Sequence, residues 1–156
     1  MSYHGNNVDC ILSIGTANYA TSAGGAGSLP AYASDTFTEV GLTGKITLPT
    51  YEISHATFNV LNDSTRRAVG GKLAEQLVEG DLVLDDTDAT HDTMFADMAV
   101  VGGNYRNWKI VTPTGEIHQF KGFLSKWTRD PYDASGDAKE VHVAFTIVIS
   151  GTVTVT

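Results

Sequence analysis

Residues 108–128 read WKIVTPTGEIHQFKGFLSKWT, and this stretch decides the class of fold. Two runs rich in apolar residues flank Pro113-Thr114-Gly115. A three-residue loop that ends in glycine is typical of a β-hairpin with a bulge. The sequence therefore predicts a hairpin with strands at 108–112 and 116–128.

The last segment of the chain alternates between apolar and polar residues. One face carries Val141, Val143, Phe145, Ile147 and Ile149, and the other carries His142, Thr146 and Ser150. A period of two is the spacing of side chains on a β-strand. We therefore expect one face in the core and the other in contact with water or with a neighbouring subunit.

Residues 73–84 end in a similar pattern. Val78, Leu82 and Leu84 share one face, whereas Glu79, Asp81 and Asp85 share the other. This indicates a half-buried strand with an acidic outer face. The spacing then changes to three and four at Met94, Phe95, Met98 and Val101, between possible N-caps at Asp88 or Thr90 and Gly102-Gly103. We expect a helix of about three turns whose apolar stripe packs on the sheet.

The front of the chain is less regular. The pattern predicts strands at 8–14 and 37–48, separated by a glycine-rich loop at about 20–35 that we expect to be flexible. Asn62-Asp63-Ser64 is a turn signal that precedes Arg66 and Arg67. Neither the loop nor the region 50–67 has an apolar pattern of its own, so we expect both to order only against neighbouring subunits.

These elements amount to six or seven strands and one helix. The predicted fold is mainly β, a β-sandwich or partly closed barrel with one α-helix against it. A length of 156 residues fits one domain over 1–156.

Composition excludes several classes of function. The formal net charge is −8, with 18 acidic and 10 basic residues, which argues against tight DNA binding. No apolar run reaches the roughly 20 residues of a membrane span, and the first nine residues lack the pattern of a signal peptide. We therefore expect a soluble protein made inside the cell. Cys10 is the single cysteine, so we expect no internal disulfide and a buried thiol in the first strand.

No motif indicates catalysis or a cofactor. Read from Asp86, the chain resembles a calcium loop with Asp88, Thr90 and Asp97 at ligand positions, but His91 stands where such a loop needs glycine. A solvated helix start explains these acids better. The chain has no Gly-x-Ser-x-Gly elbow and no pair of histidines at helical spacing. We predict no catalytic, cofactor-binding or metal-binding residue, and we place Trp108, Phe120 and Trp127 in the core or in a subunit interface.

Residues 107–127 and 141–151 resemble the C-terminal half of siphophage (lambda-like) major tail tube proteins. The shared pattern is hydrophobic-x-hydrophobic-x-x-Pro-x-Gly, then Phe-x-Gly, then a last strand that ends near Ser-Gly. It falls here on Trp108, Pro113, Gly115, Phe120, Gly122 and Trp127. Residues 62–71 resemble the family's link into its next strand, and the likeness extends over about 36–156.

The resemblance implies a structural role. Subunits of this family form hexameric rings that stack into a tube, whose inner barrel continues from subunit to subunit. The tube holds the tape measure protein, conducts DNA without specific binding and ends at tail terminator and tail tip proteins. The resemblance thus implies a virion tail protein assembled in the host cytoplasm, with no cofactor and no membrane insertion.

Glu79, Asp81 and Asp85 are our candidates for an acidic lumen wall, because a basic wall would retain DNA through its phosphates. An outward, solubilising position for these three acids is the alternative. Other readings of the whole chain are the tube protein of a contractile tail, a gene transfer agent or a type VI secretion system, and a monomeric β-sandwich that binds carbohydrate. An acid-based hydrolase lacks a convincing carboxylate pair.

Overall fold

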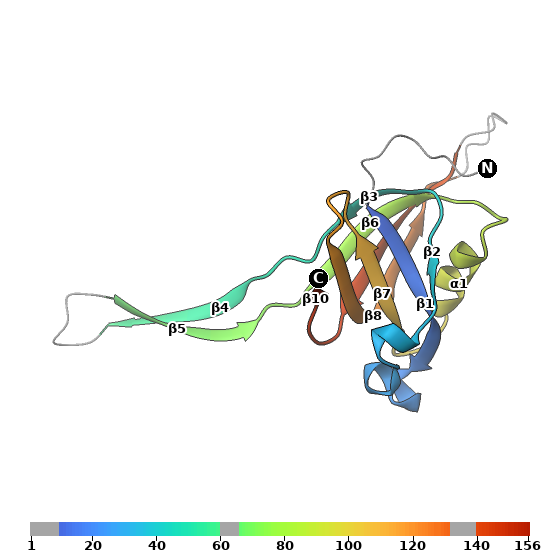
Figure 1. Ribbon diagram of the computed structural model, residues 1–156. Helices are drawn as coiled ribbons and strands as arrows, with labels where there is room; N and C mark the ends of the chain where they lie inside the picture. Colours follow the sequence, from blue (N-terminus) through green and yellow to red (C-terminus); the bar gives the residue numbers. More distant parts are fainter. Residues whose placement is uncertain (1–9, 60–65, 132–139) are drawn as a thin grey trace.

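The computed structural model describes residues 10–59, 66–131 and 140–156. These residues form ten β-strands, three short 3-10 turns and one α-helix (Figure 1). In chain order they are β1 Ile11–Ala20, η1 Thr21–Ala23, η2 Gly25–Ser28, η3 Tyr32–Ser34, β2 Phe37–Glu39, β3 Thr43–Thr47, β4 Ile53–Asn59, β5 Arg66–Leu73, β6 Leu77–Val83, α1 Ala89–Asp97, β7 Asn104–Val111, β8 Ile117–Arg129, β9 His142–Ile149 and β10 Thr154–Val155.

Eight strands form one antiparallel sheet in the order β2-β1-β7-β8-β9-β6-β3, and β10 continues along β8 beyond the end of β9. The fold is therefore mainly β with one helix, as the sequence predicted. β4 and β5 pair only with each other.

The main sheet is curled into a partly closed barrel. The Val40 amide donates to Leu12 O of β1, and Leu42 O accepts from the Val83 amide of β6. In a flat sheet, the edges β2 and β3 would lie about 29 Å apart, six strand spacings of about 4.8 Å. The two steps from Val40 to Leu42 span at most about 7 Å. The sheet must therefore bend until its two edges meet.

The barrel interior holds the apolar side chains that the alternating strands supply. Trp108, Phe120 and Phe145 are the largest fully buried side chains, and the buried cluster also contains Leu12, Ile14, Val40, Val78, Leu82, Met94, Ile110, Leu124, Val143, Ile147 and Ile149. Burial of each large apolar side chain stabilises the fold by about 1.5–3 kcal/mol. The predicted alternation of β9, and that of Val78 and Leu82 in β6, is thus confirmed.

The predicted hairpin is confirmed as β7 and β8. The Gly115 amide donates to Thr112 O at 2.9 Å and the Thr112 amide to Glu116 O at 2.9 Å. Gly115 has φ 88°, a left-handed conformation that favours glycine. β7 begins four residues before the predicted start, because Asn104, Arg106 and Asn107 are polar but buried.

Two predictions about the front of the chain need correction. The strand expected at 37–48 is two strands, because the chain passes from one sheet edge to the other at 40–42, where Leu42 has φ 52°. The strand expected at 8–14 extends to Ala20, and residues 8 and 9 lie outside the described part. In the glycine-rich loop, η1 lies against β1 and η2 lies against β1 and β7, and Asn107 Nδ2 donates to Pro30 O at 3.1 Å. The flexibility of that loop stays a prediction.

The helix begins where the sequence placed it. Asp88 is the N-cap, and its Oδ1 accepts from the Thr90 amide at 2.8 Å. The predicted packing of the apolar stripe is confirmed for Met94 and Met98, which lie in or against the core, but not for Phe95 and Val101. Met94 is buried, but Phe95 is 54% exposed and Val101 is 95% exposed. Thr90, His91 and Asp97 are buried instead, because each has a polar partner inside the molecule.

Candidate assembly site

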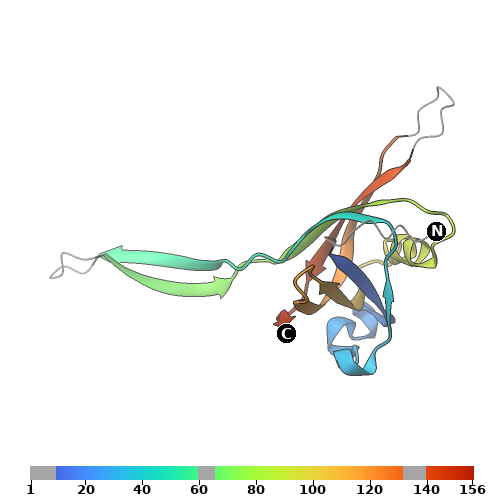
Figure 2. The same cartoon turned by 45° about the horizontal axis from the view of Figure 1, so that its top comes forward.

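β4 and β5 form an arm that projects away from the barrel (Figures 1 and 2). Every side chain of β5 is exposed, and so are those of 51–58. Large apolar side chains on the arm and at its base are between 45% and 58% exposed: Tyr51, Ile53, Phe58, Val69 and Leu73. A two-stranded ribbon is at best marginally stable alone in water. This arm therefore needs a covering surface.

The register of the arm separates its two faces. Phe58 stands opposite Arg67, and Ala56 stands opposite Val69. Opposed residues share a face, and alternate residues along a strand share it too. Ala56, Phe58, Arg67 and Val69 therefore form one surface, which we call the tip face. Residues 53–59 form β4, and the ordering of the region 50–67 on assembly stays a prediction. The predicted turn at 62–64 lies outside the described residues.

α1 presents a second apolar surface to solvent. Asp92, Phe95 and Ala96 follow the helical spacing of three and four and are all exposed. We call these three residues the outward face of α1. The Phe95 ring centroid lies 6.4 Å from that of Trp127 and 5.0 Å from the guanidinium carbon of Arg129. These contacts hold the ring in place on the surface.

Buried polar contacts fix the orientation of α1. Arg106 Nε donates to Asp97 Oδ2 at 2.6 Å, and Asn104 Nδ2 donates to Asp97 Oδ1 at 2.7 Å. His91 bridges two other segments: its Nδ1 accepts from the Asp85 amide at 3.1 Å, and its Nε2 lies 2.8 Å from Gly41 O. These partners assign a neutral ring with the proton on Nε2. The helix is thereby held with Phe95 turned outward.

The three acids proposed from the sequence for the lumen wall, Glu79, Asp81 and Asp85, have different surroundings in the structure. Glu79 is exposed on β6, whereas the Asp81 Oδ1 atom accepts from the Lys45 amide of β3. Asp85 lies beyond the end of β6 at Val83, so it does not share the strand face that the sequence suggested. Hydrogen bonds from the Thr87 hydroxyl and amide lower the pKa of Asp85.

The residues of the tail tube pattern lie in the hairpin and the core. Trp108 and Phe120 are fully buried, and Trp108 Nε1 donates to Gly122 O at 3.2 Å. Pro113 and Gly115 form the turn. Trp127 is half-buried at the far end of β8, against Phe95.

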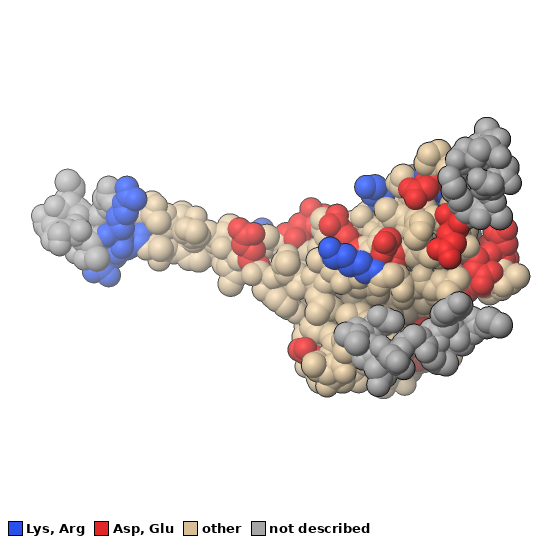
Figure 3. Space-filling model, turned by 90° about the horizontal axis from the view of Figure 1, so that it is seen from above, with Lys and Arg blue, Asp and Glu red and all other residues tan. Residues whose placement is uncertain are grey.

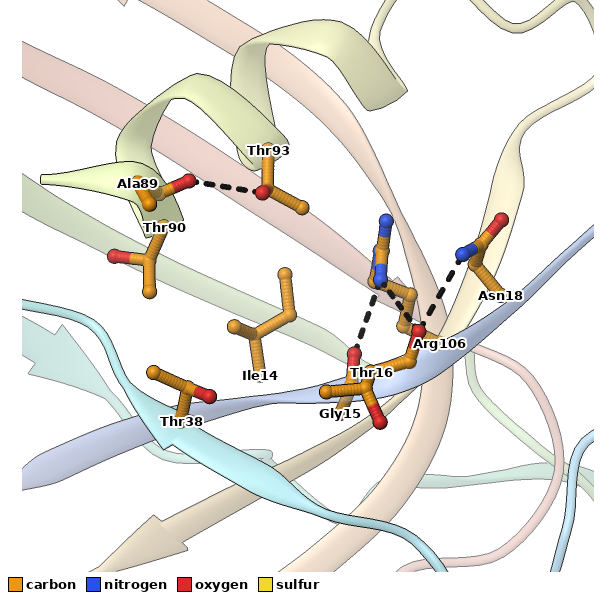
Figure 4. A pocket seen from close by; sticks show the side chains of 9 residues that line it. All are labelled: Ile14, Gly15, Thr16, Asn18, Thr38, Ala89, Thr90, Thr93 and Arg106. Carbon is orange, nitrogen blue, oxygen red and sulfur yellow. Dashed lines mark hydrogen bonds between the residues drawn. The ribbon is translucent and has the colours of Figure 1, made fainter.

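A shallow pocket of about 340 Å³ lies between β1, β2 and α1 (Figure 4). Its lining is mostly hydroxyl and aliphatic, with Arg106 as its single charged side chain. Arg106 is already bound to Asp97 and to the carbonyl oxygens of Gly15 and Thr16. None of the lining residues is Asp, Glu, His, Cys or Lys, so the lining offers no general base.

The carboxylates of the calcium-like stretch have other partners. Asp88 caps α1 and Asp97 binds Arg106. Within 10–59, 66–131 and 140–156, no group of three or more His, Cys, Asp or Glu side chains could hold a metal ion. In the same ranges, no helix has the length and apolar character needed to cross a membrane.

Sequence reasoning missed both apolar surfaces of this site. The signal for the tip face was present, since Ala56 and Phe58 alternate on one strand and Arg67 and Val69 on the next. Which residues of the two strands stand opposite each other depends on the register between β4 and β5, and the sequence alone does not predict that register. The signal for α1 was misleading, because the apolar spacing did not reveal that Asp97 and His91 have buried partners.

No protein-family model and no curated protein matches this sequence. Solved structures do match the fold. A chain from the tail of an empty gene transfer agent particle with C6 symmetry has a TM-score of 0.61 at 13% identity, over 99% of both chains. A chain from the sheath-tube complex of an extracellular contractile injection system has a TM-score of 0.61 at 9% identity, over 99% of this chain and 92% of that one. One from the sheath/tube terminator of such a system has 0.67 at 8% identity, over 100% and 99%. Over its whole length, the chain thus shares its fold with components of phage-like tails and injection tubes.

Proposed function

We propose that the chain is a structural subunit of a phage-like tail, which assembles with copies of itself into the tail tube. The observation that carries this proposal is the arm, an exposed apolar ribbon that projects from the partly closed barrel. In a monomer the exposed ribbon adds no buried apolar surface and so no stability. In a polymer a neighbouring subunit can cover it. The similarity in fold to a C6-symmetric tail supports the same role.

The finer assignment follows from the sequence pattern. We propose hexameric rings, stacked into the tube of a siphophage-like tail, because residues 107–127 and 141–151 resemble that family. The tube would hold a tape measure protein, conduct DNA and bind terminator and tip proteins, in a virion tail assembled in the host cytoplasm. The role is structural, not enzymatic. The tube of a contractile tail or injection system is the second candidate, favoured by its similarity in fold.

Electron microscopy of the purified chain tests the proposal. We expect hollow tubes of stacked rings at high protein concentration. Monomers that stay dispersed at every concentration would contradict it and would favour a monomeric binding module. Microscopy of the parent particle separates the two tail types, because only a contractile tail surrounds its tube with a sheath.

The channel wall is a further part of the proposal. Glu79 is our first candidate for the lumen, because it is exposed on β6, while Asp81 and Asp85 are engaged in local hydrogen bonds. In tubes of the Glu79→Lys variant we expect added DNA to be retained more strongly at low salt. Glu140→Lys, an equal charge change outside β6, is the matched control. A high-resolution tube with Glu79 on its outer surface would refute this assignment.

A further inference from the structure

α1 buries polar residues and exposes apolar ones. Its inner face carries Thr90, His91 and Asp97 together with Met94, whereas its outward face carries Phe95 and Ala96 beside Asp92. Ala99 and Val101, in the turn that follows, are exposed as well. A solvated helix normally has the opposite arrangement. This surface therefore has the character of an interface, in which aromatic residues commonly supply most of the binding energy.

The arm has a surface of matching chemistry. Its tip face presents Phe58, Val69 and Ala56, with one cation, Arg67. The outward face of α1 presents Phe95 and Ala96 with one anion, Asp92. For the described residues, no ion pair involves Asp92. The tip face thus carries the cation Arg67 and the outward face carries the anion Asp92, while the exposed guanidinium of Arg129 lies over the Phe95 ring beside it.

The distribution of charge along the molecule points the same way. Residues 51–73 carry three of the ten basic residues and only two of the eighteen acidic ones. Figure 3 shows basic side chains at the far end of the arm and acidic ones over the body. The arm and α1 lie on opposite sides of the barrel (Figures 1 and 2). Two copies in the same orientation can therefore bring the arm of one to α1 of the next.

We propose that the outward face of α1 receives the tip face of the arm from a second copy of the chain. This inference rests on the proposed self-assembly and names its contact. Phe58 and Val69 pack against Phe95 and Ala96, and Arg67 pairs with Asp92. The contact joins two different surfaces, so each copy can bind one neighbour through its arm and another through α1. Such head-to-tail contacts build a ring or a filament and not a closed dimer.

Charge reversal tests the pairing. Arg67→Glu places two acids in contact, and we expect the critical concentration for tube assembly, measured by sedimentation, to rise about tenfold or more. Arg66→Glu is the matched control, since Arg66 stands next to Arg67 but on the opposite face of β5. We expect it to change the critical concentration by less than about twofold.

The double variant Arg67→Glu with Asp92→Lys restores opposite charges in exchanged positions. We expect its critical concentration to return to within about threefold of the unaltered chain, whereas Asp92→Lys alone assembles poorly. Thermal melting of each dissociated variant is the check that the variant folds. Equal assembly by Arg67→Glu and Arg66→Glu, or no recovery in the double variant, would overturn the proposed pairing.

Cross-linking gives a second readout that does not depend on assembly strength. In a Cys10→Ser background, chains with Phe58→Cys are mixed with chains with Phe95→Cys and oxidised under assembly conditions. We expect a disulfide-linked heterodimer of the two. If the unaltered chain forms tubes but this heterodimer is absent, the arm docks elsewhere and only this inference fails. If the unaltered chain forms no tubes, the proposed function itself fails.

Discussion

Arg106 of β7 and Asp97 at the end of α1 form a buried ion pair, with 2.6 Å between Nε and Oδ2 and 3.1 Å between Nη2 and Oδ1. The same guanidinium donates through Nη1 to Gly15 O at 3.0 Å and to Thr16 O at 3.3 Å. One side chain thus joins β7, α1 and β1. Because α1 is fixed at this point, Phe95 remains on the surface while Met94 stays in the core.

Replacing Asp97 by Ala leaves a buried guanidinium without its anion. We expect the free energy of unfolding to fall by about 3–5 kcal/mol, since breaking a buried pair costs more than the pair contributes. Denaturant unfolding followed by tryptophan fluorescence measures the change. Asp92→Ala, on the exposed side of the same helix, is the control and is expected to change stability by about 0.5 kcal/mol or less.

His91 is expected to resist replacement for a different reason. His91→Phe fills a similar volume, but it leaves Gly41 O and the Asp85 amide without their side-chain partner. We expect a loss of about 1–3 kcal/mol, the penalty for unsatisfied buried groups. Hydrogen exchange at the Asp85 amide should rise in parallel. An unchanged exchange rate there would show that the ring does not hold this segment.

Asp88 connects stability to pH. Burial raises the pKa of Asp88, but hydrogen bonds from the Thr90 hydroxyl and amide outweigh it, so the pKa lies below its ordinary value. A depressed pKa in the folded state contributes stability above the unfolded value of about 3.9, and the contribution disappears as pH falls through the folded value. When the pH is lowered past about 4, we expect the melting temperature of the unaltered chain to fall. The melting temperature of Asp88→Asn should fall less steeply.

Position 122 requires glycine because the neighbouring strand leaves no room for a side chain. A Cβ atom there would lie 2.3 Å from Val148 O of the neighbouring strand, whereas one at Gly27 would meet nothing within 4 Å. We expect Gly122→Ala to lower the free energy of unfolding by about 1–3 kcal/mol through overpacking. Gly27→Ala should be close to neutral in the same thermal melts. Similar melting of the two variants would show that the β8–β9 pair can separate at little cost.

The sequence predicted best where the chain alternates cleanly and turns tightly. The Pro113-Thr114-Gly115 hairpin, the alternation of β9 and the buried face of β6 all depend on local periodicity, and all are present in the structure. The cap at Asp88 was equally readable, since its bond reaches only two residues along the chain.

The predictions failed where the bounds or faces of a strand depend on residues far away in the sequence. β7 extends through Asn104 and Arg106 because Asp97 satisfies both side chains. The strand at 37–48 divides because Val40 binds β1 and Leu42 binds β6. The faces of the arm follow from the register between β4 and β5. None of these partners is visible in a local pattern, so the site on α1 and the arm could not be assembled from the sequence.

Closure of the barrel also sets an order of events during folding. β7, β8 and β9 pair with near neighbours in the chain, but Arg106 of β7 binds Gly15 of β1 across 91 positions. Ordering so long an intervening segment costs entropy before any contact offsets it, and non-local pairings of this kind slow folding. We therefore expect the meander of β7 to β9 to form early and the N-terminal strand to join last, turning an open sheet into a finished subunit.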